Sequence, residues 1–398
     1  MNEQTNTQGQ QNLSFKIEQL DLFVFRAPAE PPVQTSFGIM RDRPAVLVRV
    51  RDADGAFGWG EIWCNFPAVG AEHRARMAAH YLPSLVLGQS WASPSACFET
   101  LTERLAVLAI QSGESGPIQQ MIAGLDTAIW DLLARKRDEP LWKVLAGDTG
   151  FQPAPVAVYA SGLNPTEPER LAAGKMAEGY RAFKLKVGFG ADRDVGNLRA
   201  LRDVIGGTLP LFADANQAWG YDDAVDAAHR MARFELGWLE EPMRADVPRE
   251  RWAQLAQAQP IPLAGGENLA GMRQFAPYLF GPGLAVIQPD LGKWGGLSGC
   301  LAVGRAAVTA GKMFCPHWLG GGIGQMASLH LKAAVGGEGY VEVDANPNPL
   351  RELLAMPTFF LTQGRVELGG AGGLGVVPDL SASKDFIVSV VGVPAAGV

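Results

Sequence analysis

The chain has 398 residues, of which 47% are hydrophobic and 19% are charged, and its formal net charge is −7. This size and apolar content predict a large barrel domain together with a smaller domain. The mildly acidic charge balance argues against nucleic-acid binding, and the sequence has no basic helix of the kind that binds a membrane surface. It also has no run of about 18 apolar residues, so we expect no transmembrane helix.

The N-terminal third predicts a tail followed by a small mixed domain. Residues 1–14 begin with a polar stretch rich in Gln, Asn and Thr, which predicts a disordered tail and no signal peptide. Apolar and polar residues then alternate as in strands from about Phe15 to Val50, and helical periodicity follows over about 71–147. We therefore expect an α+β domain over residues 15–150.

Residues 151–345 contain one structural unit that recurs along the chain. Each unit is a short apolar strand, a polar residue at its end, a loop and an Ala-rich helix. The expected strand ends are spaced by 23 to 28 residues and lie near Tyr159, Lys186, Asp214, Glu240, Glu267, Asp290, His317 and Glu342. This pattern predicts an α/β fold with a TIM-like (β/α)7-8 barrel. Residues 346–398 have strand-like pieces and Gly-rich turns, and we expect them to return to the N-terminal domain and complete a capping domain.

The four cysteines are scattered along the chain and form no CxxC pair; they are Cys64, Cys97, Cys300 and Cys315. Scattered cysteines predict reduced thiols and a cytoplasmic protein. Cys315 lies two residues before His317, and we expect it to fill the barrel interior.

Three acids follow neighbouring expected strands: Asp214, Glu240 and Glu267. Adjacent strands lie about 5 Å apart, so these carboxylates can converge at the C-terminal face of the barrel. Three like charges need a cation, and all-oxygen ligation favours Mg²⁺, with Mn²⁺ as a possible substitute, over zinc. Asn216 shares a side of its strand with Asp214 and is predicted to orient a ligand. Glu241 is the alternative to Glu240, but strand alternation points it away, toward a salt bridge at the barrel rim.

Basic and acid/base candidates lie on other strands. Lys184 and Lys186 share one side of a strand, and repulsion between two ammonium groups disfavours protonation of each, which makes a lysine usable as a base. Asp290 and His317 end the next strands after the acidic trio, and a carboxylate beside an imidazole predicts a histidine acid/base across the mouth from Lys186. Glu342 could hydrogen-bond an enolate oxygen if its pKa is raised.

Together these stretches resemble the enolase superfamily, and specifically the mandelate racemase group of the mandelate racemase / muconate lactonizing enzyme family. The matching stretches are Lys184-Leu-Lys186, Asp214-Ala-Asn216, Leu239-Glu240-Glu241-Pro242, Gly265-Gly266-Glu267-Asn268 and Pro289-Asp290-Leu-Gly-Lys293-Trp-Gly295-Gly296, followed by His317 and Glu342. The resemblance covers nearly the whole chain. The muconate-cycloisomerase group uses a lysine after the sixth strand, for which Lys293 is the candidate, but Asp290 followed by His317 favours the mandelate racemase group.

The resemblance implies a role for each residue. Asp214, Glu240 and Glu267 are the expected metal ligands, and the expected catalytic residues are Lys186, Lys184, His317, Asp290 and Glu342. The implied reaction is Mg-dependent abstraction of the α-proton of a small carboxylate through an enediolate. We expect dehydration of a polyhydroxy (sugar) acid to a 2-keto product. The alternatives are a racemase or epimerase of a 2-hydroxy or amino acid derivative and, from another class, a barrel that binds metal and ligand without turnover. A homo-oligomer is expected.

Substrate specificity is expected to come from two loops of the capping domain. One is the stretch from Pro32 to Arg43, with Phe37 and Arg41, and the other begins at Trp63. Loops of this kind commonly exclude water from a site. A departure from mandelate racemase itself is the Gly320-Gly321-Gly322 loop that follows His317, which leaves the substrate open.

Overall fold

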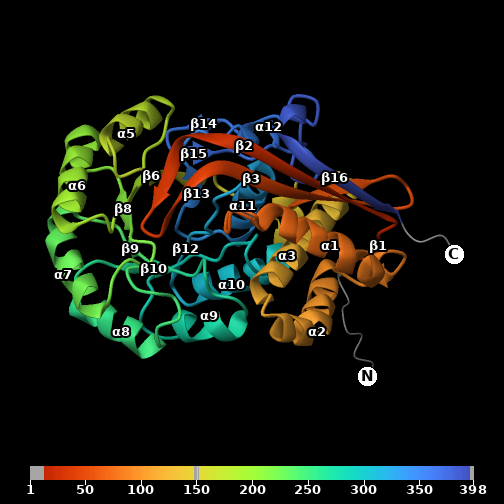
Figure 1. Ribbon diagram of the computed structural model, residues 1–398, viewed down its shortest axis with the longest axis horizontal. Helices are drawn as coiled ribbons and strands as arrows, with labels where there is room; N and C mark the ends of the chain where they lie inside the picture. Colours follow the sequence, from red (N-terminus) through yellow and green to blue (C-terminus); the bar gives the residue numbers. More distant parts are fainter. Residues whose placement is uncertain (1–12, 148–149, 151, 395–398) are drawn as a thin grey trace, which may run out of the picture.

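A computed structural model of the protein describes residues 13–147, 150 and 152–394. Residues 1–12 of the predicted tail lie outside this part of the chain. Two bodies lie side by side in Figure 1, a barrel ringed by helices and a capping domain that combines a sheet with helices. This arrangement confirms the fold class expected from the sequence. None of the described helices is long and apolar enough to span a bilayer.

The capping domain contains a four-stranded antiparallel sheet in the order β16-β2-β3-β4. Its strands are β2 (Gln19–Thr35), β3 (Gly38–Arg51), β4 (Phe57–Ile62) and β16 (Ile387–Pro394), and the domain also holds β1 (Phe15–Lys16), β5 (Ser90–Trp91), α1 (Gly70–Val86), α2 (Pro94–Ser112), α3 (Ser115–Lys136) and α4 (Leu141–Ala146). Because β16 pairs with β2, the C-terminal segment returns to this domain.

Side chains of the capping sheet alternate between two cores. Leu22, Val24 and Val48 belong to a core shared with α1, α2 and α3, whereas Phe23 and Phe25 belong to the core of the barrel. The strand period of two therefore places the sheet between its own helices and the barrel. β4 lies so close to α3 that a Cβ on Gly58 or Gly60 would overlap the α3 backbone.

The barrel consists of eight parallel strands, β6 to β13, with helices between them. The strands are β6 (Val156–Leu163), β7 (Phe183–Lys186), β8 (Leu211–Asp214), β9 (Leu239–Glu240), β10 (Leu263–Gly265), β11 (Val286–Ile287), β12 (Met313–Phe314) and β13 (Val341–Asp344). The helices are α5 (Pro168–Ala177), α6 (Ala191–Ile205), α7 (Tyr221–Met231), α8 (Arg249–Ala258), α9 (Met272–Leu279), α10 (Gly296–Thr309), α11 (Gly322–Val335) and α12 (Pro349–Leu353), with the short elements η1 (Ala232–Phe234), β14 (Leu361–Thr362), β15 (Arg365–Val366) and η2 (Lys384–Phe386). Neighbours pair in sequence order from β6 to β12, and β13 pairs with β6.

The observed strand ends agree with the expected ones on one side of the barrel and depart from them on the other. β7, β8 and β9 end at the expected residues, whereas β10, β11 and β12 end two or three residues early. An isolated bridge between Asp290 and His317 continues the pairing beyond β11 and β12. β6 extends past Tyr159 to Leu163, because it pairs with β13 opposite Glu342 and beyond. Tyr159 is thus fully buried inside the barrel and not at its mouth.

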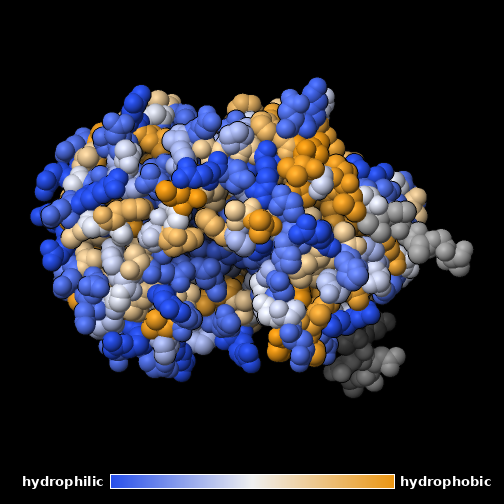
Figure 2. All heavy atoms as spheres, viewed as in Figure 1, coloured by the Kyte–Doolittle hydropathy of each residue, from blue (hydrophilic) through white to orange (hydrophobic). Residues whose placement is uncertain are grey.

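The surface is mostly hydrophilic on the barrel side of the view in Figure 2. Apolar surface gathers in that view near the capping sheet. The valines Val388 and Val390 of the edge strand β16 are half exposed. Most other large apolar side chains of the described residues are buried in the cores of the two bodies.

Candidate active site at the C-terminal face of the barrel

Both lysines of β7 point into the mouth of the barrel, where each meets carboxylates. The Nζ atom of Lys184 lies 2.6 Å from Glu240 Oε1 and 2.9 Å from Glu342 Oε1, and that of Lys186 lies 2.5 Å from Asp214 Oδ2. Burial lowers the pKa of both lysines, but the neighbouring carboxylates raise it more, so that the net direction is upward. Lys184 does lower the pKa of Lys186, as expected, but the expectation of a net lowered pKa is wrong for this arrangement, because the neighbouring carboxylates outweigh the repulsion.

The three acids predicted to bind metal lie on successive strands. Asp214 and Glu240 stand opposite each other in the β8–β9 register, and Glu267 follows β10 by two residues. All three are buried, and each is paired with a basic side chain of the barrel. Glu240 also accepts hydrogen bonds from Gln288 Nε2 at 2.6 Å and from Trp238 Nε1 at 3.2 Å. In the described part of the chain no three His, Cys, Asp or Glu side chains stand ready to surround an ion.

The donor chemistry of this cluster nevertheless fits a hard divalent cation. The pKa of Glu240 is raised to about 7, first by burial and then by the charges of Asp214, Glu342 and Glu267, although Lys184 acts in the opposite direction. Asn216 donates its Nδ2 proton to Asp214 at 3.2 Å, while its buried Oδ1 has no partner among the described residues. Crowded carboxylates and an unused amide oxygen are oxygen ligands of the kind that Mg²⁺ takes. An ion would take over oxygens that the lysines and His317 now hold.

Asp290 and His317 form a buried dyad, as the sequence pattern predicts. The imidazole Nδ1 lies 2.6 Å from Asp290 Oδ2, and Nε2 lies 2.7 Å from Glu267 Oε2. Asp290 uses its other oxygen to accept the backbone N–H groups of Gly292 and Lys293 at 2.8 and 3.0 Å. Burial lowers the pKa of His317, but the carboxylates of Glu267, Glu342 and Asp290 raise it well above its usual value. Asp290 therefore fixes the ring and leaves Nε2 facing the acidic cluster.

Glu342 differs from the expectation in its charge. It accepts hydrogen bonds from the Ser161 hydroxyl and, at 3.3 Å, from the Trp318 backbone N–H. Burial raises its pKa, but Lys184, His317 and Lys186 lower it more, to about 2. The predicted hydrogen bond to an enolate requires a raised pKa, and this condition is contradicted, because an ionised carboxylate only accepts hydrogen bonds. Sequence reasoning missed Ser161, since a serine two residues past Tyr159 gives no charge signal.

Of the two side chains left open by the sequence, Glu241 is buried at the rim and Lys293 is partly buried there. Lys293 pairs with Glu267 at 2.8 Å, and its ammonium lies 4.9 Å from the centre of the Trp63 ring. Glu241 accepts two hydrogen bonds from Asn268 Nδ2, at 2.9 and 3.0 Å, in place of the expected salt bridge. Burial raises the pKa of Glu241 to about 8, helped by the charge of Glu267.

The capping domain covers the mouth with an aromatic group. Phe37 is at the turn between β2 and β3, with its ring 5.1 Å from that of Phe66, and Trp63 lies 6.5 Å from Phe66. The hairpin tip is tied to the barrel by the Ser36 hydroxyl, which donates to the Asn216 carbonyl at 2.9 Å. Trp63 reaches the site through Lys293, whose ammonium lies over the Trp63 ring. Arg41 is exposed in β3, and no hydrogen bond or ion pair given by the described residues joins it to the cluster.

Two further capping-domain side chains reach the barrel and were not expected from the sequence. Arg43 pairs with Asp344 at 2.5 Å, with both side chains almost fully buried. Glu61 accepts backbone N–H groups of Gly321 and Gly324. The available signals were weak: Arg43 is the last residue of the stretch predicted to control specificity, and Asp344 follows Glu342 at strand spacing. A carboxylate partner 301 positions away cannot be read from either segment.

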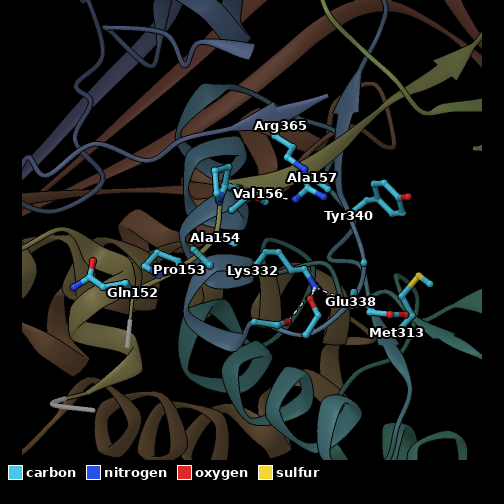
Figure 3. A pocket seen from close by; sticks show the side chains of 15 residues that line it. Gln152, Pro153, Ala154, Val156, Ala157, Met313, Lys332, Glu338, Tyr340 and Arg365 are labelled. Atoms are coloured by element: carbon cyan, nitrogen blue, oxygen red, sulfur yellow. Dashed lines mark hydrogen bonds between the residues drawn. The ribbon is translucent and has the colours of Figure 1, made fainter. Parts of the chain in front are cut away.

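The cavity in Figure 3, of about 680 Å³, lies at the other end of the barrel. It is lined where β6, β12 and β13 begin, by residues such as Val156, Met313 and Tyr340. Its buried Lys332 donates to the carbonyls of Gly336, Gly337 and Glu338 at 2.8–3.1 Å. The ammonium of Lys332 thus satisfies backbone carbonyls just past the C-terminal end of α11, which is a structural role. The candidate reacting groups lie at the opposite face of the barrel.

Comparisons with known proteins cover both bodies. Residues 19–146 match the family described as mandelate racemase / muconate lactonizing enzyme, N-terminal domain, and residues 168–382 match the family described as enolase C-terminal domain-like. A crystal structure of mandelate racemase/muconate lactonizing enzyme from Bordetella bronchiseptica RB50 is 53% identical, covers 94% of this chain and 99% of its own, and superposes with a TM-score of 0.87.

Two further relatives carry functional names. The 3,6-anhydro-alpha-L-galactonate cycloisomerase of Streptomyces coelicolor is 30% identical over 373 residues, which are 91% of this chain and 97% of the relative. The structure of L-talarate/galactarate dehydratase from Salmonella typhimurium LT2, liganded with Mg and L-lyxarohydroxamate, is 26% identical, with a TM-score of 0.82 and coverage of 95% of this chain and 94% of its own.

Proposed function

Because this chain belongs to the mandelate racemase / muconate lactonizing enzyme family of the enolase superfamily, we propose that it is a sugar-acid dehydratase. Magnesium-dependent removal of a proton next to a carboxylate is the chemistry common to the enzymes of this superfamily. The observation that carries the proposal is the placement of Lys186 at the end of β7 and of the His317–Asp290 dyad after β11 and β12, with the acidic strands β8, β9 and β10 between them.

The proposed ligands of Mg²⁺ are the carboxylates of Asp214, Glu240 and Glu267. A bound ion supplies the positive charge that stabilises a substrate carboxylate as its α-proton is removed. Asn216 is proposed to hold Asp214 in place through its amide. Lys184 is fully buried between Glu240 and Glu342, and its ammonium is proposed to balance the negative charge of these two acids.

Lys186 and His317 are proposed as the proton-transfer groups. With an ion bound, Asp214 would be engaged as a ligand, and the pKa of Lys186 would lose the charge that raises it most. The amine of Lys186 then takes the α-proton, and His317 Nε2 donates a proton to the β-hydroxyl, which leaves as water. The enol that remains takes up a proton at its β-carbon and releases the proton of its hydroxyl, which gives the 2-keto acid, so that one water is lost for each substrate molecule. Asp290 holds His317 Nδ1 and thereby keeps Nε2 directed at the mouth.

Product analysis tests the reaction. We would incubate the magnesium-loaded enzyme with a set of aldonic and aldaric acids and measure 2-keto acid formation. Dehydration predicts a 2-keto acid product from at least one of them. Recovery of an epimer with no loss of water would refute dehydration in favour of the racemase or epimerase. Turnover of none of the acids, with no α-proton exchange, would favour a barrel that only binds its ligand.

Exchange of the α-proton in D₂O tests the two-sided site. Because the two groups stand on different sides of the mouth, Lys186→Ala should retain exchange only at the epimer that faces His317, and His317→Asn should do the reverse. Each variant should lose about 10²- to 10⁴-fold in overall turnover, the usual contribution of an acid/base group. If both variants exchanged the same epimer, the site would be one-sided, and Lys293 would be the next base to replace.

A cycloisomerase is the second candidate. It is favoured by the 30% identical Streptomyces coelicolor relative, whose name gives that activity. The same two proton-transfer groups would serve it, since opening a ring by β-elimination also removes an α-proton. The product set distinguishes the two, because ring opening converts an anhydro acid or a lactone into an isomer of the same mass, whereas dehydration removes water.

Three finer expectations stay predictions. The first is that Mn²⁺ replaces Mg²⁺, which is supported by the all-oxygen donor set and tested by reconstitution with Mn²⁺. The second is a homo-oligomer that binds the small carboxylate substrate in each copy, which light scattering would measure. The third is a cytoplasmic location, which is supported by four buried cysteines that form no disulfide.

A further inference from the structure

Glu61 belongs to β4 of the capping sheet, yet its carboxylate reaches the start of the barrel helix α11. Its Oε1 accepts the N–H of Gly321 at 2.5 Å, and its Oε2 accepts that of Gly324 at 2.9 Å. These groups flank the start of α11, where backbone N–H groups lack partners within the helix. The carboxylate is 2% exposed. A side chain of one domain therefore caps a helix of the other, at the positive end of its dipole.

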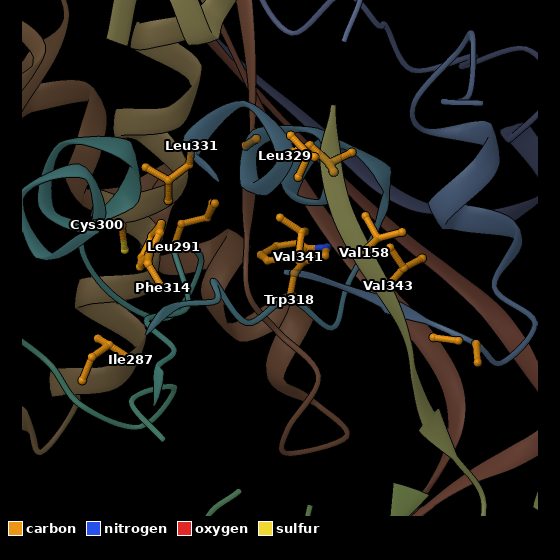
Figure 4. Packing of buried hydrophobic residues seen from close by; sticks show 14 of the residues in the cluster. Val158, Ile287, Leu291, Cys300, Phe314, Trp318, Leu329, Leu331, Val341 and Val343 are labelled. Carbon is orange, nitrogen blue, oxygen red and sulfur yellow. The ribbon is translucent and has the colours of Figure 1, made fainter. Parts of the chain in front are cut away.

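The glycines of this loop are explained by what surrounds them. A Cβ at Gly321 would lie 2.7 Å from Glu61 Oε1, and one at Gly324 would lie 2.0 Å from the Trp318 ring. The indole of Trp318 is buried, and its Nε1 donates to the Gly321 carbonyl at 2.9 Å. Figure 4 shows Trp318 among the side chains of the barrel core, which include Val341 and Leu291. The loop thus closes tightly around one carboxylate and one indole.

His317 is the residue directly before this packed segment. Besides Glu61, the capping domain also contributes Asn65, whose Nδ2 donates to the Leu319 carbonyl at 2.6 Å. On the barrel side, the Trp318 N–H donates to Glu342. The backbone from His317 to Gly324 is thus held between the two domains. A change at Glu61 would reach the imidazole through a short, tightly packed segment.

We propose that Glu61 is a positioning residue that holds the loop carrying His317, so that the capping domain determines where the imidazole stands. The proposal rests on the proposed role of His317 in proton transfer. Glu61 itself touches no proton-transfer group of the site and acts through the backbone of Gly321 and Gly324.

The chemistry of Glu61 argues against a role in stability alone. Burial raises the pKa of its carboxyl to about 7, although the backbone N–H groups of Gly324, Gly321 and Ile323 act in the opposite direction. A buried carboxylate with no basic partner is costly to hold. A carboxylate nevertheless accepts two N–H groups at once, which a glutamine of the same size does less well, because its NH₂ group is a donor.

The variants are Glu61→Gln, which keeps the side-chain volume and loses one acceptor, and Glu61→Ala, which loses both. Asp131→Asn is the matched control. Asp131 is also a buried acid of the capping domain, and it accepts the N–H groups of Trp59 and Leu374 at 2.8 and 2.7 Å. It differs from Glu61 in that it also pairs with Arg135 at 2.8 Å. It makes no bond to the loop after His317 among the described residues. Should Glu61→Ala fail to fold, Glu61→Gln carries the test.

The first measurement does not depend on the reaction. In proton NMR of the magnesium-loaded full chain, a proton between His317 Nδ1 and Asp290 at this short distance gives a resonance far downfield, which His317→Asn should remove and thereby assign. We expect this resonance to shift or disappear in both Glu61 variants and to stay unchanged in Asp131→Asn. An unchanged resonance in both Glu61 variants would overturn the proposal.

The second measurement is α-proton exchange in D₂O at each epimer. We expect Glu61→Gln and Glu61→Ala to slow exchange on the His317 side about 10- to 100-fold, with kcat lowered and KM little changed, because small misplacements of a reacting group cost rates of this order. Exchange on the Lys186 side should persist. Equal loss on both sides would overturn the proposal. If the wild-type chain exchanged nothing on the His317 side, the proposed function would fail. The NMR measurement would still test whether Glu61 positions the imidazole of His317.

Discussion

Replacing His330 with glutamine should remove a defined pH dependence from the stability of this protein. His330 lies in α11, 2% exposed, and is joined to two other segments. Its Nδ1 accepts the Trp142 backbone N–H at 3.1 Å, and its Nε2 donates to the Leu374 carbonyl at 3.2 Å. The ring must therefore be the neutral Nε2–H form, and protonation of Nδ1 would break the bond to Trp142.

The size of the change in the free energy of unfolding follows from the pKa of His330. Burial lowers the pKa of His330 from 6.5 to about 4, although the Leu374 carbonyl acts in the opposite direction. The unfolded chain therefore binds more protons than the folded chain between about pH 6.5 and 4, and stability falls as the pH falls through this window. At about 1.4 kcal/mol per pH unit, His330 accounts for a loss of about 3 kcal/mol. Its contribution is fully present above pH 6.5 and falls no further below about pH 4.

The assay is urea unfolding at pH 7.5 and at several values down to pH 4, for wild type, His330→Gln and the exposed-site control His229→Gln. The variant should be less stable at pH 7.5, since two buried backbone groups lose their partner. The difference between wild type and variant should shrink by about 3 kcal/mol on going to pH 4, with no change in the urea slope, while the control follows the wild type. A difference that stays constant with pH, or an NMR titration of His330 near pH 6.5, would refute the reasoning.

Three other predictions concern the site and the contact between the domains. Removal of Mg²⁺ by a chelator should abolish activity, and return of Mg²⁺ should restore it. Glu240→Gln should weaken metal binding, measured by calorimetry, without unfolding the barrel. Full turnover by the metal-free enzyme would contradict the proposed ligands. Arg43→Met should destabilise the protein by about 3–5 kcal/mol in thermal or urea unfolding, because it leaves Asp344 charged and buried, and Arg43→Met/Asp344→Leu should recover much of that loss. Phe37→Ala should change the order of kcat/KM among acids but stability by only about 0.5 kcal/mol, since Phe37 is 62% exposed; an unchanged order with a lower Tm would make Phe37 a packing residue.

The barrel could be predicted because its signals are local and repeated. Short apolar segments with a polar residue after each, such as those that end at Lys186, Asp214 and Glu240, recur at a nearly constant spacing, and parallel strands with helical connections follow from that spacing. The same reasoning brings the strand ends to one face. Lys186 pairs there with Asp214 of the neighbouring strand, and Lys184 pairs with Glu240 one strand further on.

The charge states of these groups could not be predicted, because they depend on distances between strands. Repulsion between Lys184 and Lys186 was foreseeable from their spacing, but the carboxylates that outweigh it come from β8, β9 and β13. The same is true of Glu342, which Lys184, His317 and Lys186 hold ionised.

What the sequence by itself determined is the class of fold, the acidic and basic residues of the barrel mouth and the family they indicate, because period, spacing and residue type are local properties of the chain. Only the tertiary structure decided how the capping domain meets the barrel: Arg43 on Asp344, and Glu61 at the start of α11. These partners are separated by 260 and more positions, and neither side chain belongs to a periodic pattern that would mark it. A pair of this kind is defined by the packing of two domains, and it exists only once both have folded and docked.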